Sequence, residues 1–65
     1  MPIFINGIEK SYLPKLSLIL EKEGILEKRG IAVAVNNQVV TKTAWNEFEL
    51  KENDKILVIK ASQGG

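Results

Sequence analysis

Few residues of this 65-residue sequence could do chemistry, because it contains neither cysteine nor histidine. It therefore lacks thiol nucleophiles, thiolate metal ligands and the usual general base near neutral pH. Among its eight Asp and Glu residues, Glu21 and Glu23 are two positions apart and would point in different directions from a helix. Glu47 and Glu49 are expected to be solvated charges at an edge. We predict no metal site and no catalytic residue.

The sequence ends in two glycines, Gly64 and Gly65. One interpretation is a frayed end or a cloning scar. The other is that the α-carboxylate of Gly65 is the reacting group, because two residues without side chains fit a narrow partner cleft and leave the carbonyl uncrowded. Oxide is a poor leaving group, so the carboxylate would first need activation, for example by a partner enzyme that transfers AMP to it from ATP.

Tight turns and one short helix separate the elements expected to position this end. Asn6-Gly7 between β-prone residues is typical of a type I′ hairpin turn, in which both residues have positive φ. A helix is expected from Lys15 to Glu23, with Pro14 at an early helical position and Gly24 as its left-handed C′ residue. Strands are expected at residues 3–5, 8–12, 31–35, 38–40 and 55–60.

Three further signals concern turns and the core. Asn36-Asn37 and Asn53-Asp54 favour turns, because Asn tolerates positive φ. Thr43 is expected to cap a single helical turn that continues through Trp45. Turn residues flank Trp45, and we interpret it as a core anchor rather than a binding residue.

The order of these elements favours an α+β fold, in which one helix crosses one face of a mixed sheet of four to five strands. The helix would pack through an apolar stripe made of Leu16, Ile19 and Leu20. Strand 55–60 contains four consecutive apolar residues and is expected at the centre of the sheet, beside the first strand, with both faces at least partly covered. Residues 1–60 would form the domain and residues 61–65 a flexible tail.

Strand parity predicts a docking surface near this tail. If Ile3 and Ile5 face the helix, Phe4 faces away from it, and Leu57 and Ile59 join Phe4 on the open side of the sheet. Three large apolar side chains on adjacent strands would form an exposed patch, which is typical of an interaction site. The alternatives are that the parity is reversed or that a loop covers the patch.

Charge and hydropathy argue against other classes of protein. Nine Lys and Arg against eight Asp and Glu give a net charge of +1, which disfavours a nucleic-acid partner. The cluster Lys28-Arg29 is interpreted as a solvated loop. The apolar run Ile31–Val35 is far shorter than the roughly 20 residues that span a bilayer, and Met1 to Phe4 lacks the features of a signal peptide. We therefore expect a cytoplasmic protein with no membrane partner.

Taken in order, these motifs resemble those of the ThiS family, the sulfur carrier proteins of thiamine biosynthesis, which have a ubiquitin-like β-grasp fold. The resemblance covers the whole chain. It rests on Ile5-Asn6-Gly7, Ile31 to Asn36, Val39-Val40, Trp45, Asn53 to Ile56 and Gly64-Gly65. Two positions depart from the family pattern and bear on local turn geometry: Lys42, where members often carry Arg, and Asn53, where Gly is common.

The resemblance implies a carrier that is acted on by partners and has no activity of its own. An E1-like, ThiF-like adenylyltransferase would use ATP to convert Gly65 to an acyl-adenylate. Sulfur from a persulfide donor would then replace AMP to give a thiocarboxylate, and a ThiG-like thiazole synthase would take up this sulfur. Gly64 would be needed for entry into the partner cleft, and the chain itself would bind no cofactor.

Other interpretations stay open at this point. A sulfur carrier like the small subunit of molybdopterin synthase also ends in Gly-Gly on a β-grasp fold, although such chains are usually longer. In a ubiquitin-like modifier, the glycine carboxylate would become an amide to a lysine. In a stand-alone β-grasp binding module, the Gly-Gly end would be incidental, and deletion of Gly65 would leave the affinity unchanged.

Overall fold

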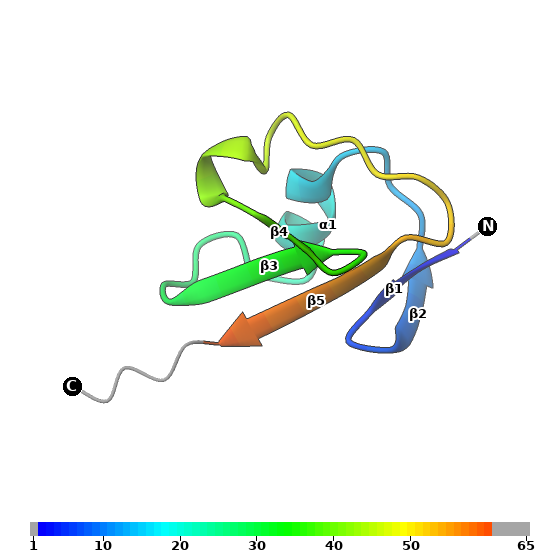
Figure 1. The fold of residues 1–65 in the computed structure, drawn as a ribbon, viewed down its shortest axis with the longest axis horizontal. Coiled ribbons are helices and arrows are strands. Elements are labelled where there is room, and N and C mark those ends of the chain that lie inside the picture. The colour runs from blue at the N-terminus through cyan, green and yellow to red at the C-terminus, as the bar shows by residue number, and fades with distance from the viewer. Residues whose placement is uncertain (1, 61–65) are drawn as a thin grey trace.

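The computed structural model describes residues 2–60, and these form a mixed sheet with a helix against one face (Figure 1). The strands of this part of the chain are β1 (Pro2–Ile5), β2 (Ile8–Ser11), β3 (Ile31–Val35), β4 (Gln38–Val40) and β5 (Lys55–Lys60). The helix α1 spans Leu16–Lys22, and a short 3-10 helix, η1, spans Lys42–Ala44.

The strand order is β2-β1-β5-β3-β4. β1 and β5 are parallel, and the other neighbours are antiparallel. The predicted α+β class and the central position of β5 are confirmed.

Two hairpins form the sides of the sheet, and both turn on residues with positive φ. Asn6 and Gly7 connect β1 to β2 with φ values of 50° and 82°. Asn36 and Asn37 connect β3 to β4 with φ values of 51° and 71°. Two-residue loops with positive φ at both positions are type I′ turns, whose twist matches that of the flanking strands. The turn predictions at both pairs are confirmed.

α1 begins later than predicted, and Pro14 lies outside it. Lys15 has extended backbone angles, with φ of −119° and ψ of 141°, and forms a β-bridge with Glu49. The Leu50 amide also donates a hydrogen bond to the Pro14 carbonyl over 2.8 Å. This pairing with a distant segment holds Pro14 and Lys15 in an extended conformation, so the helix begins only at Leu16.

The C-terminal end of α1 is the glycine cap that the sequence predicts. Gly24 has a φ of 74°, and its amide donates to the Glu21 carbonyl over 3.0 Å. The Ile25 amide donates to the Leu20 carbonyl over 2.8 Å. These two bonds define a Schellman motif, in which the residue after the glycine makes an apolar contact. Ile25 makes that contact by packing against the core.

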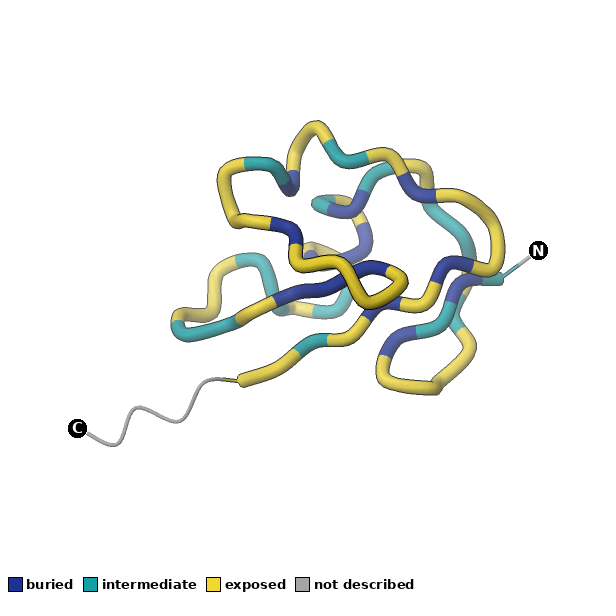
Figure 2. Tube along the Cα trace, viewed as in Figure 1, coloured by how far each residue is buried: buried dark blue, intermediate teal, exposed yellow. Residues whose placement is uncertain are grey.

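The core lies between α1 and one face of the sheet. The helix contributes Leu16, Ile19 and Leu20, and the strands contribute Ile3, Ile5, Val33, Val35, Val40 and Ile56. Trp45 joins this core with 2% of its surface exposed, and its indole N–H donates to the Val40 carbonyl over 3.0 Å. Its interpretation as a core anchor is confirmed. Figure 2 shows buried segments of the chain on the strands and the helix, and exposed residues along the turns and outer loops.

The predicted helix cap at Thr43 is wrong. Thr43 is not a cap, because it lies inside η1, and the residue before η1 is Thr41. The hydroxyl oxygens of Thr41 and Thr43 are 3.2 Å apart, and Thr41 makes no capping bond with its side chain. On β5, Leu57 and Ile59 are 47% and 50% exposed, so their face of the central strand is only partly covered, as predicted. α1 packs on the other face of the sheet, so this face of β5 stays open in the described structure.

Candidate functional site

The predicted reacting residue Gly65, its neighbour Gly64 and the rest of the predicted tail lie outside the described residues. The structure places the strand that leads to them. β5 is the central strand, and it ends at Lys60, opposite Ile31 at the start of β3. Its backbone pairs with β1 only at Lys55 and Ile56, so the last residues of β5 extend past the β1–β2 hairpin (Figure 1).

The first half of β5 is fixed on its β1 side by Asn6. The Asn6 amide N–H donates to the Ile56 carbonyl over 2.9 Å. The Asn6 side chain then continues the pairing, because its Oδ1 accepts from the Val58 amide over 2.8 Å and its Nδ2 donates to the Val58 carbonyl over 3.3 Å. The sequence analysis identified Asn6 as a turn residue only, and it missed this second role.

On the β3 side of β5, Asn36 holds the strand in the same way, through hydrogen bonds to the backbone of Lys55. Its amide N–H donates to the Lys55 carbonyl over 2.8 Å, and its Oδ1 accepts from the Lys55 amide over 2.9 Å. Its Nδ2 donates to Oδ1 of Asp54 over 2.9 Å, while Oδ2 of Asp54 accepts from the Lys51 amide over 2.8 Å. Asp54 is buried and both its carboxylate oxygens are used. Side chains from both hairpin turns therefore hold β5: Asn36 at its start and Asn6 at Val58.

The open face of the sheet carries the residues predicted to dock a partner. Leu57 and Ile59 lie on this face and are about half exposed, whereas Phe4 is only partly exposed. Phe4 is paired with Lys55, which places it beside the beginning of β5, while Ile59 is near the end. The structure thus puts the three residues on one face but spreads them along the strand. Docking itself remains a prediction.

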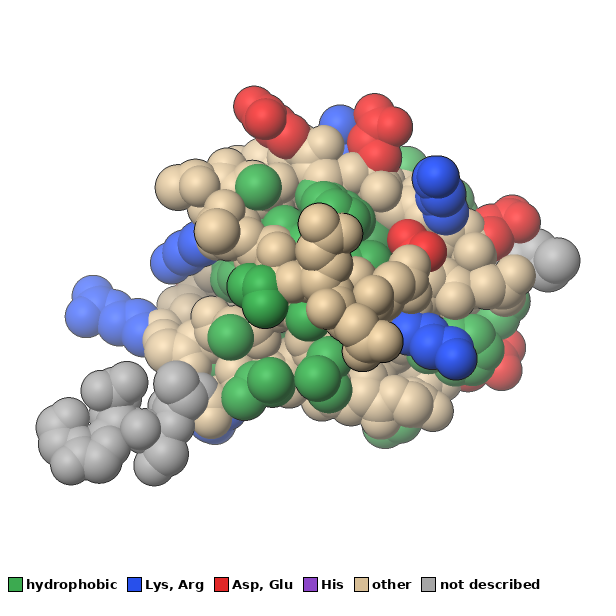
Figure 3. Space-filling view, in the orientation of Figure 1, with side chains coloured by type: hydrophobic (Ala, Val, Ile, Leu, Met, Phe, Trp, Pro, Cys, Tyr) green, Lys and Arg blue, Asp and Glu red, His purple; other side chains and the backbone are tan. Residues whose placement is uncertain are grey.

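The register adds residues that the sequence analysis did not include in this patch. Leu57 is opposite Ala34, Ile59 is opposite Ala32, and Ala34 is in turn opposite Val39 on β4. Val39 is 72% exposed. The two alanines lie on β3, between β5 and β4, and their side chains are small. The larger side chains of Leu57, Ile59 and Val39 therefore project beyond them on this face. Figure 3 shows hydrophobic side chains gathered across the middle of the visible surface. Strand parity on residues 38–40 could have identified Val39.

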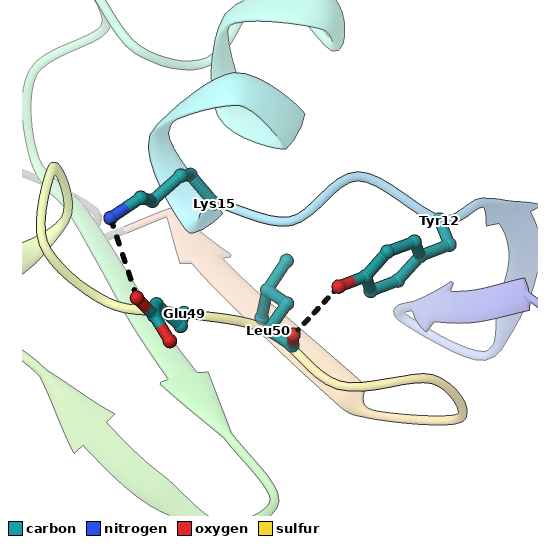
Figure 4. Close-up of polar contacts among 4 residues, drawn as sticks. All are labelled: Tyr12, Lys15, Glu49 and Leu50. Carbon is teal, nitrogen blue, oxygen red and sulfur yellow. Dashed lines mark hydrogen bonds and ion pairs between the residues drawn. The ribbon is translucent and has the colours of Figure 1, made fainter.

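The acidic residues considered in the sequence do not form a joint site. Oε2 of Glu49 is 3.8 Å from Nζ of Lys15 (Figure 4). Glu47 is exposed. Beside this ion pair, the Tyr12 hydroxyl donates to the Leu50 carbonyl over 3.1 Å. These contacts join the segment before β5 to the start of α1. Within residues 2–60, no three acidic side chains are grouped closely enough to hold a metal ion.

Comparisons with known proteins relate the chain to one family. The model of the ThiS family matches residues 10–65. A solved structure, the thiamine biosynthesis protein (ThiS) from Geobacter metallireducens, is similar with a TM-score of 0.82. The two sequences are 17% identical, and the match covers 100% of both chains. This likeness confirms the predicted β-grasp fold. Among curated proteins, none matches the sequence significantly.

Proposed function

This chain belongs to the ThiS family, and from that membership we propose that it is a sulfur carrier of thiamine biosynthesis that bears its sulfur on Gly65. The family match carries the proposal, because it runs from residue 10 through Gly65 and so includes the Gly-Gly pair. The fold supports it, since side chains from two turns hold the strand that leads to this pair, at Lys55 and at Val58. The chain would act as a substrate for other enzymes and not as an enzyme.

The proposed chemistry takes place at the carboxylate of Gly65 in three steps. A carboxylate oxygen attacks the α-phosphorus of ATP in a ThiF-like adenylyltransferase, and pyrophosphate leaves. A persulfide sulfur then attacks the carbonyl carbon of the acyl-adenylate, and AMP leaves. A thiol cleaves the resulting acyl disulfide to a thiocarboxylate, which donates its sulfur to a ThiG-like thiazole synthase. ATP is bound by the partner, and the carrier needs no cofactor.

We place partner docking on the open face of the sheet. Leu57, Ile59 and the partly exposed Phe4 form the proposed patch, and Val39 extends it onto β4. Apolar side chains exposed together on one face are typical of interaction sites. The patch continues toward the end of β5 at Ile59, one residue before the last described residue. A partner that covers it would therefore be next to the point at which residues 61–65 begin.

A cytoplasmic location is part of this proposal, because ATP and the partner enzymes would have to be available there. In residues 2–60, no helix has both the length and the apolar character needed to cross a membrane.

The mass of the intact protein tests the proposed function. The chain is incubated with ATP, the adenylyltransferase and a persulfide donor, and a variant that lacks Gly65 is the control. Replacing oxygen by sulfur adds nearly the same mass as oxidising Met1 to its sulfoxide, so the product is also treated with iodoacetamide. A thiocarboxylate is alkylated under mild conditions and a sulfoxide is not.

The expected result is an ATP-dependent, alkylatable mass gain that requires Gly65. If a demonstrably active adenylyltransferase produces no gain, the sulfur-carrier function is wrong and a binding module becomes the better interpretation. If an amide to a lysine forms instead, the chain is a modifier. Loss of molybdenum cofactor rather than thiamine in cells without the protein would assign it to the other sulfur-carrier pathway.

A further inference from the structure

Three cations that are distant in sequence lie toward the same end of the sheet, the end where the described chain stops. Lys60 is the last residue of β5 and is opposite Ile31, so Arg29 immediately precedes this end of β3. β4 is antiparallel to β3, with Val40 opposite Val33, and the chain beyond Val40 therefore continues toward the same end. Lys42 begins η1 there. We call Arg29, Lys42 and Lys60 the basic end.

The charges of the basic end are free within the described structure. All three side chains belong to exposed residues. The ion pairs found among residues 2–60 are Lys10 with Glu23 and Lys15 with Glu49, and neither includes them. In Figure 3, the charged side chains visible at this end of the molecule are Lys and Arg.

The local charge is therefore positive although the whole chain carries only +1. Glu27 precedes Lys28 and Arg29, and it makes no ion pair with either of them in the described structure. Glu47 is the nearest acidic residue after Lys42 along the chain, and it too makes no ion pair with the basic end. The described part of this nearly neutral chain thus has a basic surface next to Lys60, the residue before the predicted tail 61–65.

The position of this surface relative to Gly65 limits what it can contact. Gly65 is five positions after Lys60, and a chain of that length reaches at most about 18 Å when extended. While Gly64 and Gly65 lie in a narrow cleft, the basic end therefore stays within about that distance of the reacting carboxylate, beside the mouth of the cleft. The three cations would therefore face the rim of the partner's cleft.

Building on the proposed function, we propose that the basic end docks against acidic residues at the mouth of the adenylyltransferase cleft. Lys60 follows Ile59 at the end of β5, and strand alternation places these two side chains on opposite faces of the sheet. The basic end therefore borders the apolar patch at the edge of the sheet where β5 ends. The partner would therefore combine an apolar area with an acidic margin. Exposed charges at the rim of an interface mainly raise the association rate and make it dependent on salt. Three cations are too few for strong binding to nucleic acid at physiological salt, which leaves a protein as the occupant.

Single charge reversals with equal effects on net charge test this inference. Arg29→Glu and Lys42→Glu alter the basic end, and Lys51→Glu alters an exposed lysine in the turn before β5. Each changes the net charge from +1 to −1, since +1 minus 2 is −1. Pyrophosphate release by the adenylyltransferase is measured while the carrier and ATP concentrations are varied separately at low and high salt. Circular dichroism and thermal unfolding confirm that each variant is folded.

We expect Arg29→Glu and Lys42→Glu each to lower kcat/KM for the carrier about threefold to tenfold at low salt. The loss should shrink at high salt, where exposed charges are screened, and the KM for ATP should not change. Lys51→Glu should stay close to the unaltered chain. An equal loss in Lys51→Glu would show that only net charge matters, and an altered KM for ATP would place the cations at the nucleotide. Either result overturns the inference.

No change in Arg29→Glu and Lys42→Glu, with normal pyrophosphate release from the unaltered chain, would also overturn the inference and leave the proposed function standing. If the unaltered chain releases no pyrophosphate with an enzyme known to be active, the proposed function is wrong, and this inference is wrong with it.

Discussion

The side-chain amide of Asn6 makes two hydrogen bonds to the backbone of Val58, one accepted by Oδ1 over 2.8 Å and one donated by Nδ2 over 3.3 Å. The last backbone pair between β1 and β5 is Ile5 with Ile56. The amide of Asn6 therefore extends the pairing beyond the point where β1 turns away from β5. Asn6 also has the positive φ that the type I′ turn requires. One residue both shapes the hairpin and attaches it to the strand that leads to the tail.

Asn6→Gly separates these two roles, because glycine keeps the positive φ and loses the amide. We expect its free energy of unfolding to fall by about 1–3 kcal/mol, and the Val58 amide to exchange its hydrogen faster. Asn6→Ala should be less stable again, because alanine is strained at a φ of 50°. Urea denaturation and hydrogen exchange measure both effects. Exchange at Val58 that stays as slow in Asn6→Gly as in the unaltered chain would contradict this role.

Asp54 is expected to stabilise the start of β5 through the contact of its carboxylate with Asn36. Asp54→Ala removes the acceptors for Asn36 Nδ2 and the Lys51 amide. Asn36→Gly keeps a residue suited to positive φ. A double-mutant cycle of these variants, followed by urea denaturation, should give a coupling free energy of about 0.5–3 kcal/mol. Additive effects would show that the two side chains stabilise the chain independently, against the contact described above.

The parts of the fold that could be predicted have local causes. Asn6-Gly7 and Asn36-Asn37 specify their turns because few other residues tolerate positive φ. Gly24 specifies the end of α1 for the same reason. The side chains of Ile3 and Ile5 face the core and that of Phe4 faces away, which follows from the two-residue period of a strand alone. Each of these signals is complete within a few residues, so no knowledge of the rest of the chain was necessary.

The parts that were missed depend on contacts between distant residues. Pro14 and Lys15 are extended because Glu49 and Leu50 pair with them, and nothing near Pro14 indicates this. Likewise, the bonds from Asn6 to Val58 involve residues 52 positions apart. The apolar run in β5 was interpreted as a strand with both faces at least partly covered, and Leu57 and Ile59 on one face are about half exposed. Such a run shows that two faces are apolar, but it does not show whether this chain covers both of them.

At the predicted reaction site, Gly64→Val tests the need for a side-chain-free approach. We expect a loss of adenylation of about tenfold or more, because a branched side chain next to the reacting residue would have to enter the narrow cleft. The free energy of unfolding of the variant should be unchanged. Pyrophosphate release and urea denaturation provide the two measurements. Efficient adenylation of Gly64→Val would show that the cleft accepts a side chain at this position.

On the open face, Leu57→Glu is expected to weaken partner docking while the domain stays folded. Leu57 is 47% exposed on the side of the sheet away from α1, so a charged replacement remains in contact with water in the free protein. The change in stability should stay below about 1 kcal/mol. In the complex the charge would be buried against an apolar surface, and we expect kcat/KM for adenylation to fall about tenfold or more.

Leu18→Glu is the matched control for this prediction. Leu18 is a similarly exposed leucine, with 41% of its surface accessible, but it belongs to α1, on the opposite side of the sheet from Leu57. The two substitutions change hydrophobicity and charge identically, so a general effect of either would appear in both variants. Adenylation should be normal in Leu18→Glu and reduced in Leu57→Glu. Normal adenylation by a folded Leu57→Glu protein would remove the open face from the docking surface, and equal losses in both variants would show that the effect is not specific to it.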